Sequence, residues 1–417
     1  MTAFSFSDLT LEIAGNTYTG EYLADVTISK AVDGIGTSGI STSQLSGKVL
    51  TSYRFPQGSS VKVTYKGWEF PTYYIDNPEY DGTAMSFTAY DRCKGLDIPF
   101  DCTNYPQYAP KQKDDDDTTS GSSSSSGSSG GSSSTTTGTD SGSTSSGSST
   151  STGSSSSTSS DGSTVVKETT TSTKPEAKYL ASQIVMDIAD LVGFSRCNYV
   201  PQEVYLTNSE LKDKSCREVL QTITEADCGV AYCGNDNSLR FVSATGSGSG
   251  ASVKKGEYSK IIEKSQKTYT RFLIEDSKKN KYYDYGSGDY THCLMLSGTL
   301  LNETVSQRIA SSLLASSSNS GLEYLAFSID SAEISSNLEI FGQIFIPDCE
   351  TKYICRNITI SFTATSAIAS LSSPQRSESK SEYYNWLKRA NDGKVKLNTT
   401  YNTFFVNKNG SGHRIKI

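Results

Sequence analysis

The feature that most constrains this chain is a tract at residues 118–164 built almost entirely from serine, glycine and threonine. Only Asp140 and Asp161 depart from those three residue types. Such a tract has no apolar side chains to bury, so it cannot offset a backbone ordering cost of about 1–2 kcal/mol per residue. We therefore expect a solvated coil. A flexible segment of about 60 residues has a root-mean-square span of about 45 Å, so it permits contact between the parts on either side without requiring it.

The tract divides the chain into unequal blocks, since an acidic run at residues 114–117 leads into it and a Thr/Ser/Lys stretch leads out of it. Without the tract, about 350 residues remain to fold, which indicates two to four domains. We predict, in chain order, a first β-barrel domain at residues 1–112, a disordered linker at 113–175, an α+β middle domain at 176–245, a second β-barrel domain at 246–372, and a C-terminal extension at 373–417. The fold class is therefore mainly β with an α+β module.

The first block has the pattern of short antiparallel strands. Residues 60–65 (SVKVTY), 69–75 and 84–89 (AMSFTA) alternate apolar and polar side chains with a period of two. Asp81-Gly82 between the last two runs is a strong hairpin signal. Turns every 8–12 residues are typical of a small barrel or sandwich.

The block after the tract begins with helices. Leu180, Ile184, Ile188, Leu191 and Val192 fall on one helical face, and Gly193 is placed to end that helix. Ser215 and Glu218 have capping-box spacing, and Val219, Leu220, Ile223 and Ala226 continue as an apolar stripe up to Gly229. A hairpin that turns at residues 234–238 should follow.

Strand patterns return from residue 256 onward, around one helix. Val305, Ile309, Leu313 and Leu314 have helical spacing, with Asn302 or Thr304 as the cap. The strand at residues 358–364 (ITISFTA) echoes AMSFTA of the first block. We interpret the echo as the trace of a duplicated barrel.

Composition excludes several classes of protein. The net charge of −7 gives no basic face for nucleic-acid binding, and no apolar run of 18 residues predicts a membrane-spanning segment. The first residues lack the basic start of a secretory signal. Nine cysteines, an odd number without a framework, favour a reduced cytosolic protein.

The sequence nominates no catalytic, cofactor-binding or metal-binding residue. His292 and His413 are the only histidines and have no partner at catalytic or metal-ligand spacing. The pairs Cys228/Cys233 and Cys349/Cys355 do not have the spacing of a zinc site, so we expect buried thiols, although a disulfide within either pair stays open. Other acidic and aromatic residues are expected to have structural roles. The acidic run at residues 114–117 should be solvated, and Asp187 and Asp190 should lie on the polar face of a helix. The tyrosines at residues 73–74 and 282–285 should lie in sheets or at interfaces.

Three stretches resemble the baseplate-hub family of phage tail proteins, including prophage-encoded relatives. The first is FPQGSSVKVTYKGWEFPTYYIDNPEYDGTAMSFTAYDRCKGLD, which resembles the family's first barrel and ends in its AYDR…LD pattern. YLASQIVMDIADLVG with SCREVLQTITEADCGVAYCGNDNSLRFV resembles the middle domain, and residues 301–348 resemble the second barrel. The chain departs from the family at Leu301-Asn302-Glu303, where Asn-Pro-Leu is common, and at Phe341-Gly342-Gln343, where a Gly-Asp pair is common. The serine-rich tract is not a family feature.

The resemblance implies a non-enzymatic structural component of the virion tail, synthesised in the host cytoplasm. Three copies would form a ring whose two barrels per chain give pseudo-sixfold symmetry. The implied partners are two further copies, the tail tube or a distal tail protein ring on one side, and a central spike or tail fibre protein on the other. DNA would pass through without sequence-specific binding, and no cofactor is implied.

Another class stays open from the residues alone. A secreted bacterial surface adhesin or wall-binding protein with a mucin-like stalk would account for the tract and for the sequons at Asn302 and Asn357. The missing signal peptide and the odd cysteine count argue against it. A peptidoglycan hydrolase would need a catalytic motif that we do not find.

Overall fold

The structure of the protein is a computed structural model. Its described residues are 8–32, 39–102, 178–199, 204–243, 248–253, 257–288, 292–315, 322–332, 334, 338–347, 351–363, 365–373, 396–397, 403–406 and 412–415. Residues 1–109 and 176–417 form one compact unit. The predicted linker, with its serine-rich tract and acidic run, lies outside the described residues, as does Cys349.

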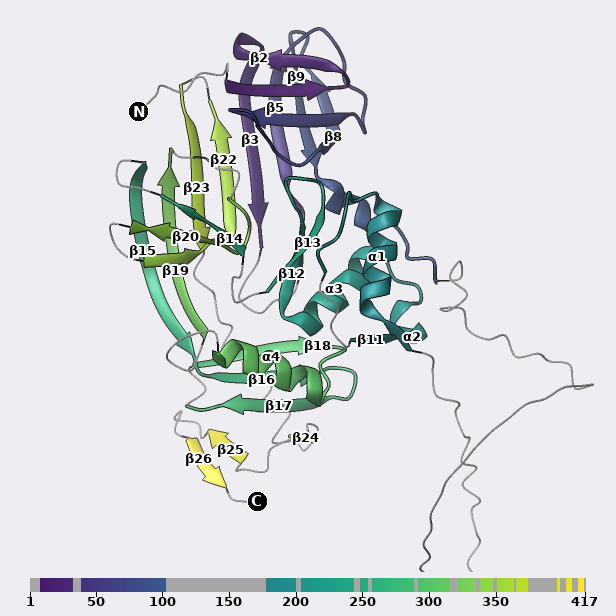
Figure 1. The fold of residues 1–417 in the computed structure, drawn as a ribbon, viewed down its shortest axis with the longest axis vertical. Helices are drawn as coiled ribbons and strands as arrows, with labels where there is room; N and C mark the ends of the chain where they lie inside the picture. Colours follow the sequence, from purple (N-terminus) through teal and green to yellow (C-terminus); the bar gives the residue numbers. More distant parts are fainter. Residues whose placement is uncertain are drawn as a thin grey trace, which may run out of the picture. The chain divides into compact units, whose positions relative to one another are not determined.

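The first block folds as a twisted antiparallel sheet, drawn in purple and blue in Figure 1. Its strands are β1 (Leu9–Ile13), β2 (Asn16–Thr19), β3 (Leu23–Ala31), β5 (Gln44–Leu50), β6 (Ser60–Tyr65), β7 (Trp68–Glu69), β8 (Tyr73–Tyr80) and β9 (Ala84–Tyr90), followed by the 3₁₀ helix η3 (Arg92–Asp97). The strand β4 (Gly39–Ser41) lies between β3 and β5 in the chain and does not belong to this sheet. The order across the sheet is β3-β5-β9-β8-β6-β1-β2. Val61, Val63 and Tyr65 point inward from alternate positions of β6, as the period-two pattern predicts.

The predicted hairpin turn at Asp81-Gly82 is confirmed. The Asp81 carboxylate accepts hydrogen bonds from the backbone N–H groups of Thr83 (2.9 Å) and Ala84 (2.8 Å). Gly82 takes a φ of +101°, which glycine adopts without the steric cost of a side chain. The turn thereby sets the register of β8 on β9.

The block after the tract contains the predicted α+β module. Its elements are β10 (Lys178–Leu180), α1 (Ala181–Val192), β11 (Tyr205–Thr207), α2 (Asn208–Leu211), α3 (Cys216–Asp227), β12 (Gly229–Cys233) and β13 (Leu239–Ser243). The capping box is present, since the Ser215 backbone N–H donates to Glu218 Oε2 at 2.7 Å. Two residues of the predicted helix face are placed wrongly. Leu180 ends β10 and is 37% exposed, because α1 begins only at Ala181. Leu191 is 52% exposed, because α1 rests on the module through a narrower stripe that includes Ile184 and Ile188.

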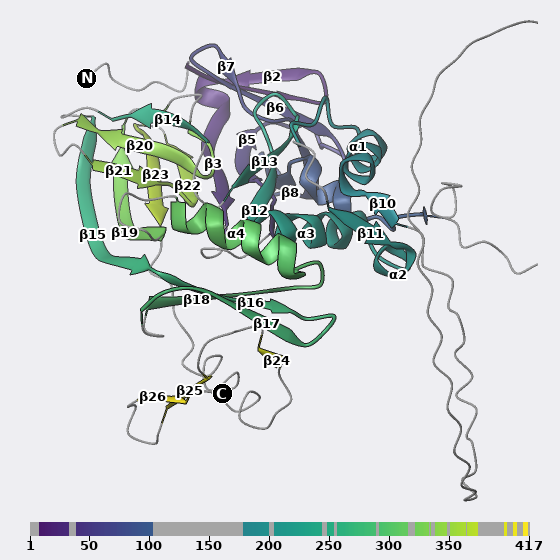
Figure 2. The ribbon, with the colours of Figure 1, turned by 60° about the horizontal axis from the view of Figure 1, so that its bottom comes forward.

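A second β unit follows, with another α/β segment inserted into it. The unit contains β14 (Gly248–Ser252), β15 (Tyr258–Tyr269), β19 (Leu322–Ser331), β20 (Gly342–Ile346), β21 (Thr351–Ile354), β22 (Asn357–Phe362) and β23 (Ala367–Ser373). The insert contains β16 (Arg271–Asp276), β17 (Lys281–Gly286), β18 (Cys293–Gly298) and α4 (Glu303–Ala315), whose Val305, Ile309 and Leu313 are buried as predicted. Figure 2 shows α4 beside these three strands. The C-terminal strands are β24 (Lys396–Leu397), β25 (Thr403–Val406) and β26 (Gly412–Ile415).

The two β units repeat one strand order. In the first unit the order is β3-β5-β9-β8, and in the second it is β15-β19-β23-β22, with every neighbouring pair antiparallel. The chain visits equivalent positions in the same sequence. The SFTA echo is not the trace of this repeat, because AMSFTA lies in β9, the third position, while ITISFTA lies in β22, the fourth. Closure of either unit into a barrel, and the domain boundaries, stay predictions.

The two units join at a seam between β3 and β22. Six residue pairs run antiparallel along it, from Val26 opposite Phe362 to Ala31 opposite Asn357. The seam merges both units into one 12-stranded sheet. Within that sheet β3 and β15 point the same way, since an even number of antiparallel steps separates them.

Candidate functional site

The seam carries a buried lysine. Lys30 is only 5% exposed and stands opposite Ile358 of β22. Its Nζ donates a hydrogen bond of 3.1 Å to Oδ1 of Asn235, in the turn between β12 and β13. Burial lowers the pKa of Lys30, while the nearby carboxylates of Asp91 and Glu339 act in the opposite direction. The β12–β13 hairpin, residues 229–243, thus reaches the seam with a polar group.

A buried carboxylate accompanies the lysine from within the first unit. Asp91, at the end of β9, accepts hydrogen bonds from the backbone N–H groups of Ser43 (2.8 Å) and Cys93 (3.0 Å). Burial raises the pKa of Asp91 to about 7, although these hydrogen bonds and Lys30 favour the charged form. The Tyr73 hydroxyl lies 3.0 Å from Ser43 Oγ, and burial raises the pKa of Tyr73.

The second unit contributes another buried acid, bound by the same hairpin. Glu339 is 5% exposed and accepts hydrogen bonds from Arg240 Nη1 at 2.7 and 2.8 Å. The Tyr232 hydroxyl donates to it as well, at 3.1 Å. Arg240 and Tyr232 belong to β13 and β12, so the hairpin bonds a group from each β unit.

The polar seam, defined as Lys30, Asp91, Asn235, Arg240 and Glu339, suits a structural task better than catalysis. Lys30, Asp91 and Glu339 are buried, and the half-buried Arg240 is bonded to Glu339, so these charges are engaged within the protein. Within the described residues, no group of three or more His, Cys, Asp or Glu side chains could hold a metal ion. Among the same residues, no helix is long and apolar enough to span a membrane.

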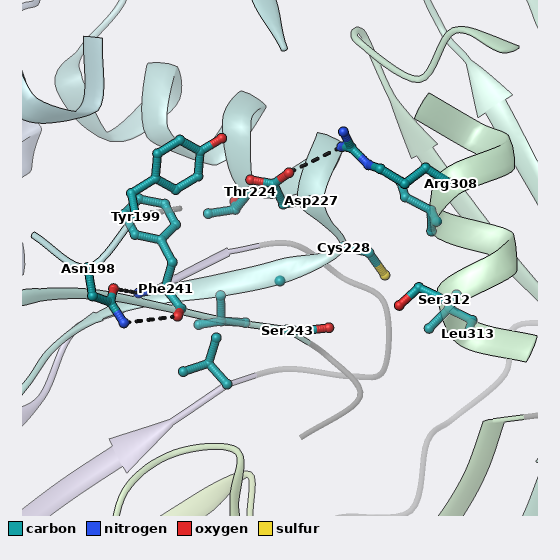
Figure 3. A pocket seen from close by; sticks show the side chains of 14 residues that line it. Asn198, Tyr199, Thr224, Asp227, Cys228, Phe241, Ser243, Arg308, Ser312 and Leu313 are labelled. Carbon is teal, nitrogen blue, oxygen red and sulfur yellow. Dashed lines mark hydrogen bonds and ion pairs between the residues drawn. The ribbon is translucent and has the colours of Figure 1, made fainter. Parts of the chain in front are cut away.

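A cavity of about 460 Å³ lies between α3, the β12–β13 hairpin and α4 (Figure 3). Arg308 of α4 crosses one side of it, with Nη2 at 3.2 Å from Asp227 Oδ1 and donating to the carbonyl of Ala226 at 2.9 Å. The cation therefore binds the last turn of α3, where carbonyl oxygens concentrate negative charge. Burial raises the pKa of the Cys228 thiol in this cavity to about 12, so it stays protonated and offers no nucleophile at neutral pH.

The residues singled out in the sequence do not gather at one place. His292 is exposed, and the side chain of His413 lies outside the described part. Cys228, Cys233 and Cys355 are buried free thiols, as expected. Tyr73, Tyr282 and Tyr283 belong to the core rather than to an exposed platform. Asp190 is exposed, and Asp187 accepts a hydrogen bond from Gln183 at 2.9 Å.

Sequence reasoning missed the polar seam. A signal for Lys30 exists in LADVTISKA, where alternation puts Val26, Ile28 and Lys30 on one face, so a lysine occupies an inward position. No comparable signal marks Asn235 or Glu339, since both lie in irregular segments whose partners are distant in the sequence.

Comparisons with known proteins give likeness in fold. No protein-family model matches the sequence, and no curated protein matches it. A 43 kDa tail protein of prophage MuSo2 from Shewanella oneidensis has 13% identity and a TM-score of 0.49, covering 88% of this chain and 96% of that one. A tail protein from Neisseria meningitidis MC58 has 7% identity and a TM-score of 0.48, with coverage of 88% and 95%.

Prophage tail protein gp18 from Listeria monocytogenes EGD-e is also similar, at 12% identity and a TM-score of 0.43, covering 93% of this chain and all of that one. These three structures are each described as tail proteins.

Proposed function

We propose that this protein is a structural component of a phage or prophage tail, and more narrowly a baseplate-hub protein that joins the hexameric tail tube to a threefold spike. The observation that carries the proposal is the repeat of one strand order in two β units. Three copies of a chain with two equivalent units present six such units, which suits a sixfold partner on one side and a threefold partner on the other. The sequence resemblance described above points to the same role.

The seam inside the chain suggests how copies join. At that seam, the fourth strand of the second unit (β22) adds to the first strand of the first unit (β3). Within the described residues, β15 has no strand on its outer edge, and β8 has none beside residues 77–80. These are the first strand of the second unit and the fourth strand of the first. Repeating the internal seam between copies therefore places β8 of one copy against β15 of the next, a head-to-tail contact that closes a ring.

The internal register predicts which residues would meet. Asp81 N donates to Ala84 O (3.1 Å) and Thr363 N to Ser366 O (2.8 Å), so the two hairpin turns align. Pro78 then corresponds to Ile360. Ile28 and Ile261 correspond as well. In each unit, pairing from equivalent residues of the third strand to the second strand, and from there to the first strand, leads to Ile28 in one case and to Ile261 in the other. Because Ile360 faces Ile28 inside the chain, Pro78 should face Ile261 between copies.

Pro78 limits strand pairing at the open edge of β8. Pro78 is opposite Phe87 of β9 in a non-hydrogen-bonded pair of the antiparallel ladder. Its backbone nitrogen therefore points away from β9 and toward the open edge. A proline nitrogen has no hydrogen to donate, and such residues protect exposed edges from unselective pairing. The contact between copies is therefore expected to be weaker than the internal seam.

The remaining parts of the proposal follow from this ring. The first β-barrel domain (residues 1–112) and the second (246–372) would form it, with the α+β middle domain (176–245) attached, and DNA would pass through the opening. The tail tube or a distal tail ring would bind one side and a spike or fibre protein the other. No catalytic, cofactor or metal residue is assigned.

The native mass of the purified chain tests the proposal. A trimer of about 135 kDa, three times 44.9 kDa, is expected by light scattering or native mass spectrometry. Negative-stain images of that species should show rings with six lobes. A chain that stays monomeric at high concentration, both alone and with tail-tube protein, would contradict the hub and move the weight to the surface-adhesin alternative.

A further inference from the structure

The β12–β13 hairpin contacts the first β unit through two asparagines. Asn235 accepts from Lys30 Nζ at 3.1 Å, and Asn237 Oδ1 accepts from the Thr72 backbone N–H at 2.7 Å. Asn237 takes a φ of +60°, a left-handed conformation that asparagine tolerates, so the turn is shaped for this contact. The hairpin is also joined to the first unit by β4, which pairs in parallel with β12.

The opposite flank of the hairpin is bonded to the second unit next to the seam. Glu339, held by Arg240 and Tyr232, starts a turn in which Gly342 N donates to the Glu339 carbonyl at 2.9 Å. Phe341 in that turn donates its N–H to the Cys355 carbonyl at 2.8 Å. Cys355 is only two residues before β22, so the turn that carries Glu339 is tied to the start of the seam strand.

The same turn stores backbone strain. Phe341 has a φ of +58°, which is unusual for a bulky side chain, and its ring lies 4.6 Å from the buried guanidinium carbon of Arg356. The Arg356 carbonyl accepts from the Val32 N–H at 3.1 Å, immediately beyond the last pair of the seam. Strain of this kind persists only where surrounding contacts hold it.

We propose that the β12–β13 hairpin is a latch that holds one end of the seam closed. That end consists of residues 30–32, at and just beyond the end of β3, and residues 356–358, at and just before the start of β22. With the hairpin in place, Lys30 and Glu339 are buried with partners; with the hairpin displaced, both would be buried without one or would have to reach water. A partly displaced hairpin would leave these charges buried without a partner, which is costly in free energy. The seam end therefore has two arrangements, one closed and one open.

The charged and polar groups that act on Lys30 and Glu339 can be named. Asp91, Glu339, Cys233 and Arg240 act on Lys30 together with its partner Asn235, and Arg240 and Tyr232 bind Glu339. Because both ends of the latch lie on one short hairpin, releasing one end frees the other. Movement of the middle module is thereby coupled to the angle between the two β units. This coupling does not depend on the proposed tail role.

Hydrogen–deuterium exchange on the full chain tests the latch. The variants are Asn235→Ala, which removes the Lys30 partner, Glu339→Gln, which removes the charge bound by Arg240, and the double variant. Lys48→Gln is the control, since it breaks an exposed 3.0 Å ion pair with Asp81 in the first unit. We expect amides 28–32 and 356–360 to exchange about tenfold faster in each single variant, while amides 85–89 in the sheet interior stay unchanged.

The double variant separates a latch from two independent contacts. If losing one contact already detaches the whole hairpin, the second substitution has no contact left to remove and adds less than about twofold to the faster exchange of the first. Multiplied effects would overturn the proposal, as would seam amides that exchange at the control rate. Faster exchange throughout the sheet would also overturn it, because that shows global destabilisation instead of a local opening. Asn235→Ala, the milder change, supplies the result if Glu339→Gln fails to fold.

Discussion

Lys30 of the first β unit and Glu263 of the second occupy equivalent positions, two residues beyond Ile28 and Ile261, yet their environments are opposite. Lys30 lies on the internal seam, buried between Asn235 and two carboxylates. Glu263 lies on the open strand β15, exposed, with Oε1 accepting a 2.6 Å hydrogen bond from the Tyr353 hydroxyl. The equivalent position of the two units therefore holds a positive charge in one and a negative charge in the other. The difference between them is that another strand, β22, pairs with the edge of β3, whereas none pairs with the outer edge of β15 within the described residues.

The largest expected effect comes from the buried member of this pair. Lys30→Met should lower the free energy of unfolding by about 3 kcal/mol, because it removes the buried ammonium that favours the charged form of the buried Asp91 carboxylate. Glu263→Gln is the matched variant, and as a surface change it should stay within about 0.5 kcal/mol. Chemical denaturation of both proteins measures the difference. Equal effects at the two positions would break the comparison.

A second test uses pH, because Asp91 has no acidic equivalent in the second unit, where the matching residue is Ser373. Burial raises the folded-state pKa of Asp91 to about 7, above the unfolded value of about 3.9. The folded state then binds more protons between those values, so stability conferred by this group is present at low pH and is lost as pH rises through 7.

We therefore expect the unfolding free energy of the wild-type protein to fall between about pH 4 and 7 more steeply than that of Asp91→Asn. Urea unfolding at several pH values gives both slopes. Parallel slopes would show that Asp91 does not titrate in this range.

The smallest effects concern the two open edges and should have opposite signs. Ile261→Pro removes an N–H that the register directs outward from β15, so it should raise the concentration needed for trimerisation several-fold without breaking the pairing with β19. Pro78→Ala adds a donor to the β8 edge and should lower that concentration. Sedimentation over a concentration series measures both. Ile368→Ser, at an exposed position within the sheet, is the control.

If the protein forms trimers that neither edge substitution affects, the hub proposal stands and the strand-to-strand contact between copies is wrong. If no trimer forms in any variant, the ring itself is in question.

Local patterns in the sequence predicted local structure well. The turn at Asp81, the capping box at Ser215 and the buried stripe of α4 each depend on residues within four positions of one another, so spacing alone reveals them. The segment at residues 338–346 is rich in apolar residues throughout but forms a strand only from Gly342, because Glu339 and Phe341 form a turn whose partners, Arg240 and Cys355, are not adjacent in the sequence.

The repeat of the β units was anticipated for the wrong reason. The SFTA echo joins strands at different positions, whereas the real correspondence lies in pairing order, which leaves little trace in residue identity. The polar seam was missed for a related cause: a buried lysine is unusual on burial statistics, and only its distant partners make it stable.

The common direction of β3 and β15 has a consequence for how such a chain can grow. Both strands end at the same rim of the sheet, and the chain leaves that rim by the connection to β5 in one unit and to β19 in the other. In the first unit the connection is short and, among its described residues, adds β4 alone, whereas in the second it contains β16, β17, β18 and α4. The opposite rim carries the tight turns at residues 81–84 and 363–366. New modules, engineered labels included, should therefore be accepted in the connections that follow β3 and β15 and rejected in these two tight turns.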